Sequence, residues 1–276
     1  MNRVIAIANQ KGGVGKTTTA VNLAASLVAN QRRVLLMDLD PQGNATMGSG
    51  VDKYQLQASS VDVLLEGVTI SSALVQVDPG GYYLLGSNQD LTSAEVQLLS
   101  RGPLKLREAL ESEALRGHFE FILVDCPPAL NMLTVSSLVA ADSLLIPMQC
   151  EYYAMEGLTA LLKTMRDLQA TVNPALQIEG ILRTMYDPRN NLATEVSNQL
   201  VMNFGDKVYR TIIPRNIRLA EAPSFGKPVL FHDRESRGAQ AYLDLAGEMI
   251  QRYGGVAAMG DAMAAVHDTN GSGEHS

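Results

Sequence analysis

The sequence predicts an α/β protein with a doubly wound, mostly parallel β-sheet that is covered by helices on both faces. Apolar runs alternate with segments of helical periodicity along almost the whole chain of 276 residues, and this alternation is typical of such a sheet. Several runs are continuously β-branched or leucine-rich, as expected of strands buried on both faces. No internal repeat and no linker divides the sequence, so we expect residues 1–253 to form a single domain.

The expected elements follow in chain order. Strands are predicted over 3–9, 33–38, 82–86, 119–125, 143–147, 177–185 and 208–213. Helices are predicted over 17–28, 104–115, 134–140, 156–172, 193–204 and 236–253. From residue 254 the chain is rich in glycine, alanine and serine, and we expect 254–276 to be a disordered tail.

Composition favours a globular protein of the cytosol. The mean hydropathy is +0.02, and no apolar run approaches the roughly 20 residues of a membrane-spanning helix. The N-terminus does not have the pattern of a signal peptide, so a cytoplasmic location is expected. The two cysteines, Cys126 and Cys150, form no C-x-x-C pair, which argues against a disulfide framework or a zinc site.

The net charge of −7 argues, for the chain as a whole, against a nucleic-acid-binding protein. The charge is unevenly spread, however. Residues 181–240 carry nine basic and six acidic side chains, so this segment has a net charge of +3 and the remainder −10. This contrast is modest, and an ordinary solvated surface would also account for it.

A glycine-rich segment, QKGGVGKTT at residues 10–18, lies between the first predicted strand and the first predicted helix. Glycines let the backbone approach phosphates closely, and the backbone N–H groups together with the helix N-terminus form an anion site. The lysine before the helix would reach the β- and γ-phosphates, and the following threonine would bind Mg²⁺. The residues predicted to bind phosphate are Lys11, Gly12, Gly13, Val14, Gly15, Lys16, Thr17 and Thr18.

This loop departs from the pattern G-x-x-x-x-G-K-[ST], because Gln10 stands where the first glycine would be and a second lysine, Lys11, follows it. In this respect it resembles the deviant Walker A motif of the ParA/MinD class of P-loop ATPases. The resemblance implies that Lys11 reaches the nucleotide of a partner subunit in an ATP-sandwich dimer. The residues by themselves show only that two lysines flank the loop.

Carboxylates follow two of the predicted strands. Asp38 and Asp40 lie two residues apart and therefore on one side of the strand end, at the edge where doubly wound sheets bind ligands. Asp40 could orient the attacking water or hold Mg²⁺ through water. The alternative is a simple turn, because Asp-Pro followed by glycine is a sequence that favours turns. Asp125 ends the apolar run FEFILVD in a Walker B pattern and is predicted to hold Mg²⁺ through a water molecule.

The last predicted strand ends in the segment IIPRN. Its C-terminal end should face the same crevice as the glycine-rich loop. Pro214 could pack on a nucleotide base and Asn216 could hydrogen-bond the edge of that base. The alternative for both residues is an ordinary turn at the strand exit.

Taken together, six segments resemble the ParA/Soj family of chromosome-partitioning ATPases over residues 3–253: KGGVGKTT, DLDPQGNAT, DCPP, QCEYYAMEGL, IPRNIRLAEAPSFGKP and SRGAQAYLDLA. The resemblance implies the P-loop NTPase fold of the deviant Walker A class, with ATP and Mg²⁺ as cofactors. The catalytic residues would be Lys11, Lys16 and Asp40, and the metal site would involve Thr17, Asp125 and Asp40. The adenine pocket would use Pro214 and Asn216. DNA would be contacted by Arg189 and Arg218. Arg215 is left open between the nucleotide site, a salt bridge and DNA.

The resemblance also implies how such a protein works. ATP would bridge a homodimer that binds double-stranded DNA without sequence preference, and a ParB-type centromere-binding protein would stimulate a slow ATP hydrolysis that releases the DNA. The protein would be cytoplasmic and associated with the nucleoid, with no membrane partner.

Other functions use the same loop. A MinD-like ATPase would need a basic amphipathic C-terminal helix to bind a membrane, and residues 256–267 contain no lysine or arginine. An iron–sulfur carrier would need cluster cysteines at a subunit interface, and a tyrosine autokinase a C-terminal tyrosine cluster. A non-enzymatic role would leave the two lysines and the aspartates of the loop region unexplained together.

Overall fold

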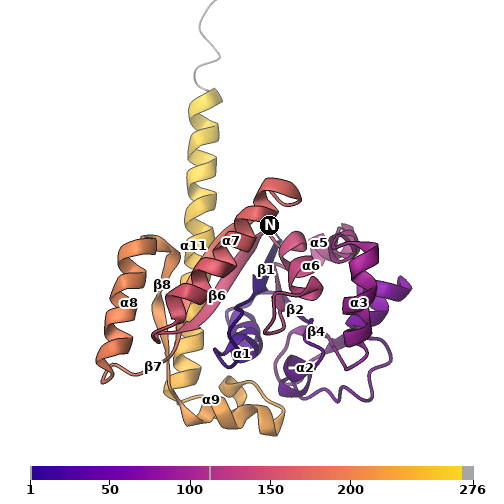
Figure 1. Ribbon diagram of the computed structural model, residues 1–276, viewed down its shortest axis with the longest axis horizontal. Helices are drawn as coiled ribbons and strands as arrows, with labels where there is room; N and C mark the ends of the chain where they lie inside the picture. The colour runs from indigo at the N-terminus through magenta and orange to yellow at the C-terminus, as the bar shows by residue number, and fades with distance from the viewer. Residues whose placement is uncertain (1, 112, 269–276) are drawn as a thin grey trace, which may run out of the picture.

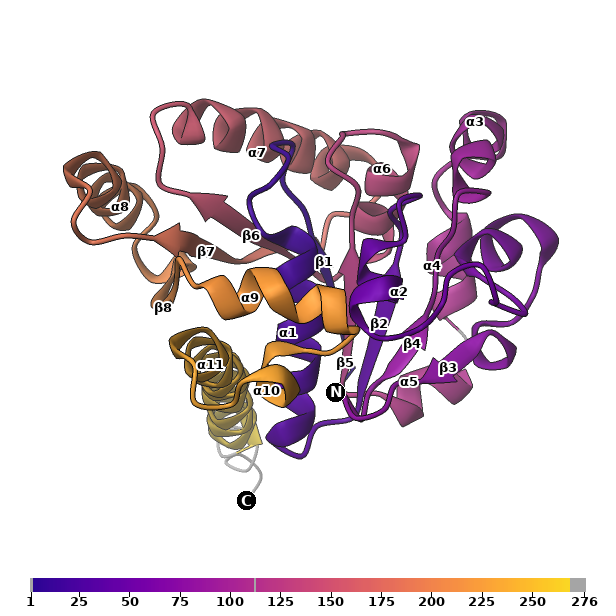
Figure 2. The same ribbon diagram turned by 90° about the horizontal axis from the view of Figure 1, so that it is seen from below.

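The computed structural model describes residues 2–111 and 113–268, and these form one eight-stranded sheet between two layers of helices (Figures 1 and 2). The strands are β1 (Arg3–Ile7), β2 (Val34–Asp38), β3 (Leu74–Gln76), β4 (Tyr83–Leu85), β5 (Phe121–Asp125), β6 (Ser143–Gln149), β7 (Gln177–Tyr186) and β8 (Val208–Pro214). Their order in the sheet is β3-β4-β2-β5-β1-β6-β7-β8. All neighbours are parallel except β3, which runs antiparallel to β4. The predicted fold class is confirmed.

The helices vary widely in length. The α-helices are α1 (Lys16–Ala29), α2 (Asn44–Gly48), α3 (Leu91–Arg101), α4 (Lys105–Leu110), α5 (Glu113–His118), α6 (Met132–Ala140), α7 (Ala154–Thr171), α8 (Asn191–Phe204), α9 (Ile217–Glu221), α10 (Val229–His232) and α11 (Arg237–Asp268). Short helical turns are η1 (Asp62–Glu66), η2 (Ile70–Ser72), η3 (Gly205–Lys207) and η4 (Ala222–Phe225). None of the helices described has the length and apolar character needed to cross a membrane.

Several elements differ from the prediction. In place of the predicted helix over 104–115 there are two shorter helices, α4 and α5. The edge strand β3 was not predicted, because three residues are too few to show the alternation of apolar and polar side chains that identifies a strand. Helix α11 continues to Asp268, past the residue at which the tail was expected to begin. The disorder expected for 254–276 stays a prediction, and 269–276 lie outside the described residues.

Strand periodicity builds two cores, one on each face of the sheet. Val4 and Ala6 of β1 pack into the core beneath α3, α4, α6, α7 and α8, whereas Ile5 and Ile7 pack into the core beneath α1 and α11. Figure 2 shows α6 and α7 on one side of the sheet and α1, α10 and α11 on the other. Because both faces are covered, the central strands are almost entirely apolar, and the polar side chains that end β2 and β5 lie at the strand ends, where sheets of this kind bind ligands.

Candidate nucleotide site

The glycine-rich loop connects β1 to α1 at the C-terminal edge of the sheet, where phosphate binding was predicted. Gly13 (φ 72°) and Gly15 (φ 87°) have left-handed backbone conformations that favour glycine. Gly15 is the N-cap of α1 and offers no side-chain acceptor, so the first N–H groups of this 14-residue helix stay available to an anion. The crest of the loop, Lys11 to Gly13, is exposed to solvent.

Two neighbouring strands hold this loop in place. The amide of Asn9 donates to the carbonyl of Pro147 in β6 (2.8 Å), and its side-chain oxygen accepts from the backbone N–H of Lys11 (3.0 Å). Thr184 in β7 donates its hydroxyl to the carbonyl of Val14 (2.8 Å). These bonds attach the loop to β6 and β7. Sequence reasoning missed Asn9 and Thr184, because neither belongs to the loop motif.

The two lysines of the loop have different surroundings. Lys16 is buried, and its ammonium donates to the carbonyl of Lys11 (3.3 Å), so that it curls back over the loop. Burial lowers the pKa of Lys16, while the nearby carboxylates of Asp125 and Asp40 act in the opposite direction. Lys11 is half exposed and forms an ion pair with Glu151, the residue that follows β6 by two positions.

Three buried aspartates cluster at the strand ends beside the loop, and two of them, Asp125 and Asp40, are near Lys16. The parallel register places Asp125 of β5 beside Asp38 of β2 on one side and Ile7 of β1 on the other. Asp38 and Asp125 are fully buried, and Asp40 is 6% exposed. Burial raises the pKa of Asp38 to about 6, although hydrogen bonds from Thr46 oppose the shift.

Asp125 differs from the other two aspartates because no donor among the described residues meets its carboxylate oxygens with good hydrogen-bond geometry, although the hydroxyl of Thr17 comes close enough to affect its pKa. Burial, and then the charge of Asp38, raise the pKa of Asp125 well above its ordinary value, and Thr17 and Lys16 only partly counteract this shift. A buried charge without a partner is costly. An ion that this carboxylate could hold, directly or through water, would remove that cost.

The donor set fits Mg²⁺ bound together with a nucleotide. Within the described chain, no group of three or more His, Cys, Asp or Glu side chains could hold a metal ion by itself. Mg²⁺ typically takes one or two protein ligands and completes its shell with phosphates and water. Asp125 and the hydroxyl of Thr17 would provide that share here.

The remaining predicted nucleotide residues lie at the end of β8. Pro214 is the last residue of this strand, and Asn216 is the N-cap of α9, where its side-chain oxygen accepts from the backbone N–H of Arg218 (2.8 Å). Asn216 thus does form the strand-exit turn that was the alternative. Its amide NH₂ group is not used in that cap, so the contact with adenine remains a prediction.

The three predicted DNA-binding arginines are at the surface: Arg189 follows β7, Arg215 follows β8, and Arg218 is in α9. Arg189 is 89% exposed in its side chain and makes a two-pronged ion pair with Asp187 (2.7 and 2.9 Å). These bonds lower the pKa of Asp187 to about 2, and the charge of Arg215 adds to the same shift. Arg218 pairs with two carboxylates of its own, Glu221 (2.9 Å) and Asp233 (3.0 Å).

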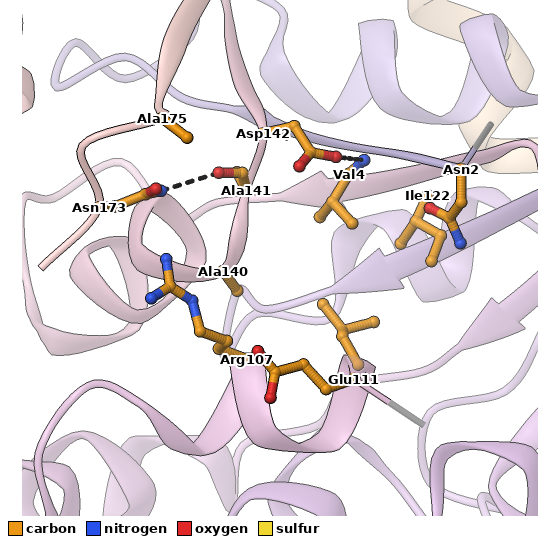
Figure 3. Close-up of a pocket in the computed structure, with 11 residues that line it drawn as sticks. Asn2, Val4, Arg107, Glu111, Ile122, Ala140, Ala141, Asp142, Asn173 and Ala175 are labelled. Carbon is orange, nitrogen blue, oxygen red and sulfur yellow. Dashed lines mark hydrogen bonds between the residues drawn. The ribbon is translucent and has the colours of Figure 1, made fainter. Parts of the chain in front are cut away.

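A cavity of about 400 Å³ lies at the opposite, N-terminal edge of the sheet (Figure 3). Its polar groups are largely used within the protein: the amide of Asn173 donates to the carbonyls of Leu138 and Ala141, and Asp142 accepts from the backbone N–H of Val4. It contains no glycine-rich turn and is remote from the strand ends that carry Asp40 and Asp125. The candidate site is therefore the crevice at the C-terminal edge.

Comparisons with known proteins agree with this geometry. A family model described as an AAA domain matches residues 2–178. The chromosome partitioning protein ParA of Caulobacter vibrioides is 48% identical over 252 residues, 91% of this chain and 94% of that protein. The chromosome-partitioning ATPase Soj of Thermus thermophilus is 50% identical over 250 residues, 91% and 96% of the two chains. Among solved structures, cobyrinic acid a,c-diamide synthase from Mycobacterium smegmatis with bound ADP and magnesium is similar, with a TM-score of 0.79 and 39% identity, over 92% of this chain and 96% of that one.

The sheet order, the glycine-rich loop and the aspartates at the strand ends define a P-loop ATPase fold. With relatives this similar over nearly its whole length, the chain belongs to the ParA/Soj family of chromosome-partitioning ATPases. The family indicated by the sequence motifs is thereby confirmed. The solved relative that holds ADP and magnesium is consistent with ATP and Mg²⁺ as the cofactors.

The unpartnered carboxylate of Asp125 leads to a prediction. Because its pKa is raised in the folded state, the free energy of unfolding of the nucleotide-free protein should fall as the pH rises above the ordinary aspartate range. Asp125→Asn removes this charge, so at pH 8 the nucleotide-free variant should be more stable than the wild type by about 1–3 kcal/mol. Urea unfolding at pH 6 and pH 8 measures the effect.

When ATP is present, adding Mg²⁺ should raise the free energy of unfolding of the wild type further, but it should not do so for Asp125→Asn. Asp244→Asn, at an exposed position of α11, is the control for a change of one charge. If Asp125→Asn proved less stable than the wild type at pH 8, the carboxylate would not be an uncompensated charge.

Proposed function

We propose that this protein is a slow ATPase that acts as a switch in chromosome or plasmid partitioning. Two copies with bound ATP and Mg²⁺ form a dimer, the dimer binds duplex DNA without sequence preference, and hydrolysis releases both. The observation that carries the proposal is the buried Asp125, left without a partner beside Lys16 and the glycine-rich loop. Such a carboxylate is explained by a site that is completed only when Mg²⁺ and a triphosphate enter.

Each residue of the site has a role in hydrolysis. The backbone N–H groups at the start of α1 and the Lys16 ammonium would hold the phosphates. The metal ion would be held by Thr17 and, through water, by Asp125. When bound, Mg²⁺ neutralises charge on the β- and γ-phosphates. Asp40 orients the attacking water; phosphoryl transfer needs positioning and charge stabilisation more than a strong base.

Dimerisation uses the exposed crest of the loop. Lys11 leaves Glu151 and contacts the phosphates bound by the other subunit, so that the triphosphate joins the two chains. A Cβ built on Gly12 meets no atom within 4 Å in a single chain, so this position is open to a second copy. Pro214 and Asn216 line the adenine end of the crevice.

DNA binding uses the loops after β7 and β8. In the dimer, Arg189 and Arg218 of both subunits lie on one face and contact phosphates, and Arg215 joins Arg189 there. Such contacts are independent of sequence and sensitive to salt. A ParB-type centromere-binding protein stimulates hydrolysis, and the protein resides on the nucleoid. The MinD-like alternative is less well supported, since residues 256–267 carry no lysine or arginine for a lipid surface.

Two variants separate binding from hydrolysis. Lys16→Ala removes the cation that holds the phosphates and should abolish ATP binding in isothermal titration. Asp40→Ala should bind ATP normally but hydrolyse it about 100-fold more slowly, because the water loses its orienting group. Normal turnover by Asp40→Ala would show that the catalytic assignment is wrong.

The dimer can be tested at Gly12. Gly12→Val should fold and bind ATP as the wild type does, because the side chain meets nothing in the single chain. In sedimentation velocity with ATP and Mg²⁺ it should remain a monomer, whereas the wild type and the control Gly157→Val should dimerise. Dimerisation of Gly12→Val would mean that the crest of the loop is not at the interface.

The ion pairs of the arginines predict the effect of removing a carboxylate. Asp187→Asn frees Arg189 and should tighten binding of the ATP-bound protein to a non-specific duplex about two- to fivefold at moderate salt. Glu195→Gln, which removes one exposed charge on α8, is the control and should have a smaller effect. In an Arg189→Ala background, Asp187→Asn should have no more effect than this control. An equal effect in both backgrounds would contradict a role for Arg189.

A further inference from the structure

A closed ring of hydrogen bonds surrounds the backbone of Asp40. Its members come from three segments that meet at the nucleotide site: Asp38 at the end of β2 with Asp40 after it, Thr46 in α2, and Ser87 after β4. Asp38, Thr46 and Ser87 are all fully buried. We infer that Thr46 and Ser87 are positioning residues for Asp40, and that their hydroxyl groups are needed for ATP turnover but not for ATP binding. This inference rests on the proposed function.

The ring can be followed bond by bond. The N–H of Asp40 donates to Asp38 Oδ1 (3.1 Å), and Asp38 Oδ2 accepts from the N–H and the hydroxyl of Thr46 (2.8 and 2.7 Å). The Thr46 hydroxyl in turn accepts from the N–H of Ser87 (2.9 Å), and the Ser87 hydroxyl donates to the carbonyl of Asp40 (2.7 Å). Both polar groups of the Asp40 backbone are therefore held. Its carboxylate is further oriented by the N–H of Gln42 (2.9 Å).

The chemistry of the ring selects a hydroxyl at position 46. Thr46 donates to Asp38 and accepts from Ser87 with the same oxygen atom. Valine has the same shape but can do neither, and it would leave a buried N–H and a buried carboxylate each short of one hydrogen bond. Serine keeps the oxygen and loses only a methyl group.

Close packing leaves the ring little freedom to relax. Gly43, in the turn between Asp40 and Thr46, has a positive φ of 63°, and a Cβ at this position would lie 2.7 Å from the carbonyl oxygen of Ser87. The turn thus packs directly on the segment that carries Ser87. If one bond of the ring is lost, the remaining contacts keep the segment folded but no longer fix the direction in which the Asp40 carboxylate points.

The ring also separates the roles of the aspartates. Asp38 accepts three hydrogen bonds and is fully engaged, whereas Asp125 accepts none. Thr46 and Ser87 use their hydroxyl groups within the ring and do not contact the nucleotide themselves; Ser87 bonds Asp40 directly, and Thr46 bonds Asp38, which holds the Asp40 N–H. A displacement of about 1 Å at a reacting group can cost about 100-fold in rate without any change in affinity.

The test compares Thr46→Val with Thr46→Ser in the full chain, with Mg²⁺, ATP and non-specific duplex DNA present. We expect kcat of Thr46→Val to fall about 10- to 100-fold, while the KM for ATP and the dissociation constant for ATP stay within about twofold of the wild type. Thr46→Ser should restore kcat to within about threefold. Ser143→Ala removes a buried hydroxyl at the other end of the sheet, where it donates to Glu179 (2.8 Å), and should leave both constants unchanged.

Several results would overturn the inference: an unchanged kcat in Thr46→Val, a parallel loss of ATP affinity, or a Thr46→Ser variant as slow as Thr46→Val. Should Thr46→Val fail to melt cooperatively, Ser87→Ala replaces it. That change removes one of the two bonds to the Asp40 carbonyl and keeps the one from the Gly43 N–H (2.9 Å), and it should lower kcat in the same selective way. A Ser87→Ala variant with wild-type kcat would then contradict the inference. If the wild type hydrolysed no ATP, both the proposed function and this inference would be wrong. If the wild type hydrolysed ATP and Thr46→Val did so at the same rate, only the inference would be wrong.

Discussion

The site depends on the crowding of negative charge at one point of the sheet. Register in the parallel sheet sets Asp38 and Asp125 side by side, and Asp40 lies two residues further on. Lys16 is the cation that faces them, and it is itself buried. Hydrogen bonds from Thr46 satisfy Asp38, but Asp125 has no such partner in the described chain. The folded protein is thus left with an excess of buried negative charge, which bound Mg²⁺ would neutralise.

The same strand ends connect the nucleotide loop to the proposed DNA surface. Thr184 of β7 holds the carbonyl of Val14 in the loop, and three residues further along the chain Asp187 holds Arg189. Arg215 is tied to the end of β7 by the bond from its N–H to the carbonyl of Tyr186 (3.3 Å). The nucleotide loop and the proposed DNA surface therefore share one edge of the sheet.

Much of this could be predicted from local patterns. An apolar strand, a glycine-rich turn between a strand and a helix, and an aspartate at a strand end are each patterns of a few consecutive residues. The fold, the loop, Asp40 and Asp125 could therefore be predicted from the sequence. The ring of hydrogen bonds was not, because Thr46 and Ser87 are 41 positions apart and no period joins them. Ion pairs such as that of Arg218 with Asp233 depend on how surface loops approach each other. Strand β3 was missed because three residues are too few to show alternation.

If the nucleotide at this site controls binding to DNA, the three nucleotide states must differ in their affinity for a duplex. We would measure the binding of the purified protein to a non-specific duplex with ATP, with ADP and without nucleotide, at low and at moderate salt. We expect binding only with ATP and a steep loss of affinity as salt rises. Equal binding in all three states would contradict it, as would the absence of binding by a protein that dimerises with ATP.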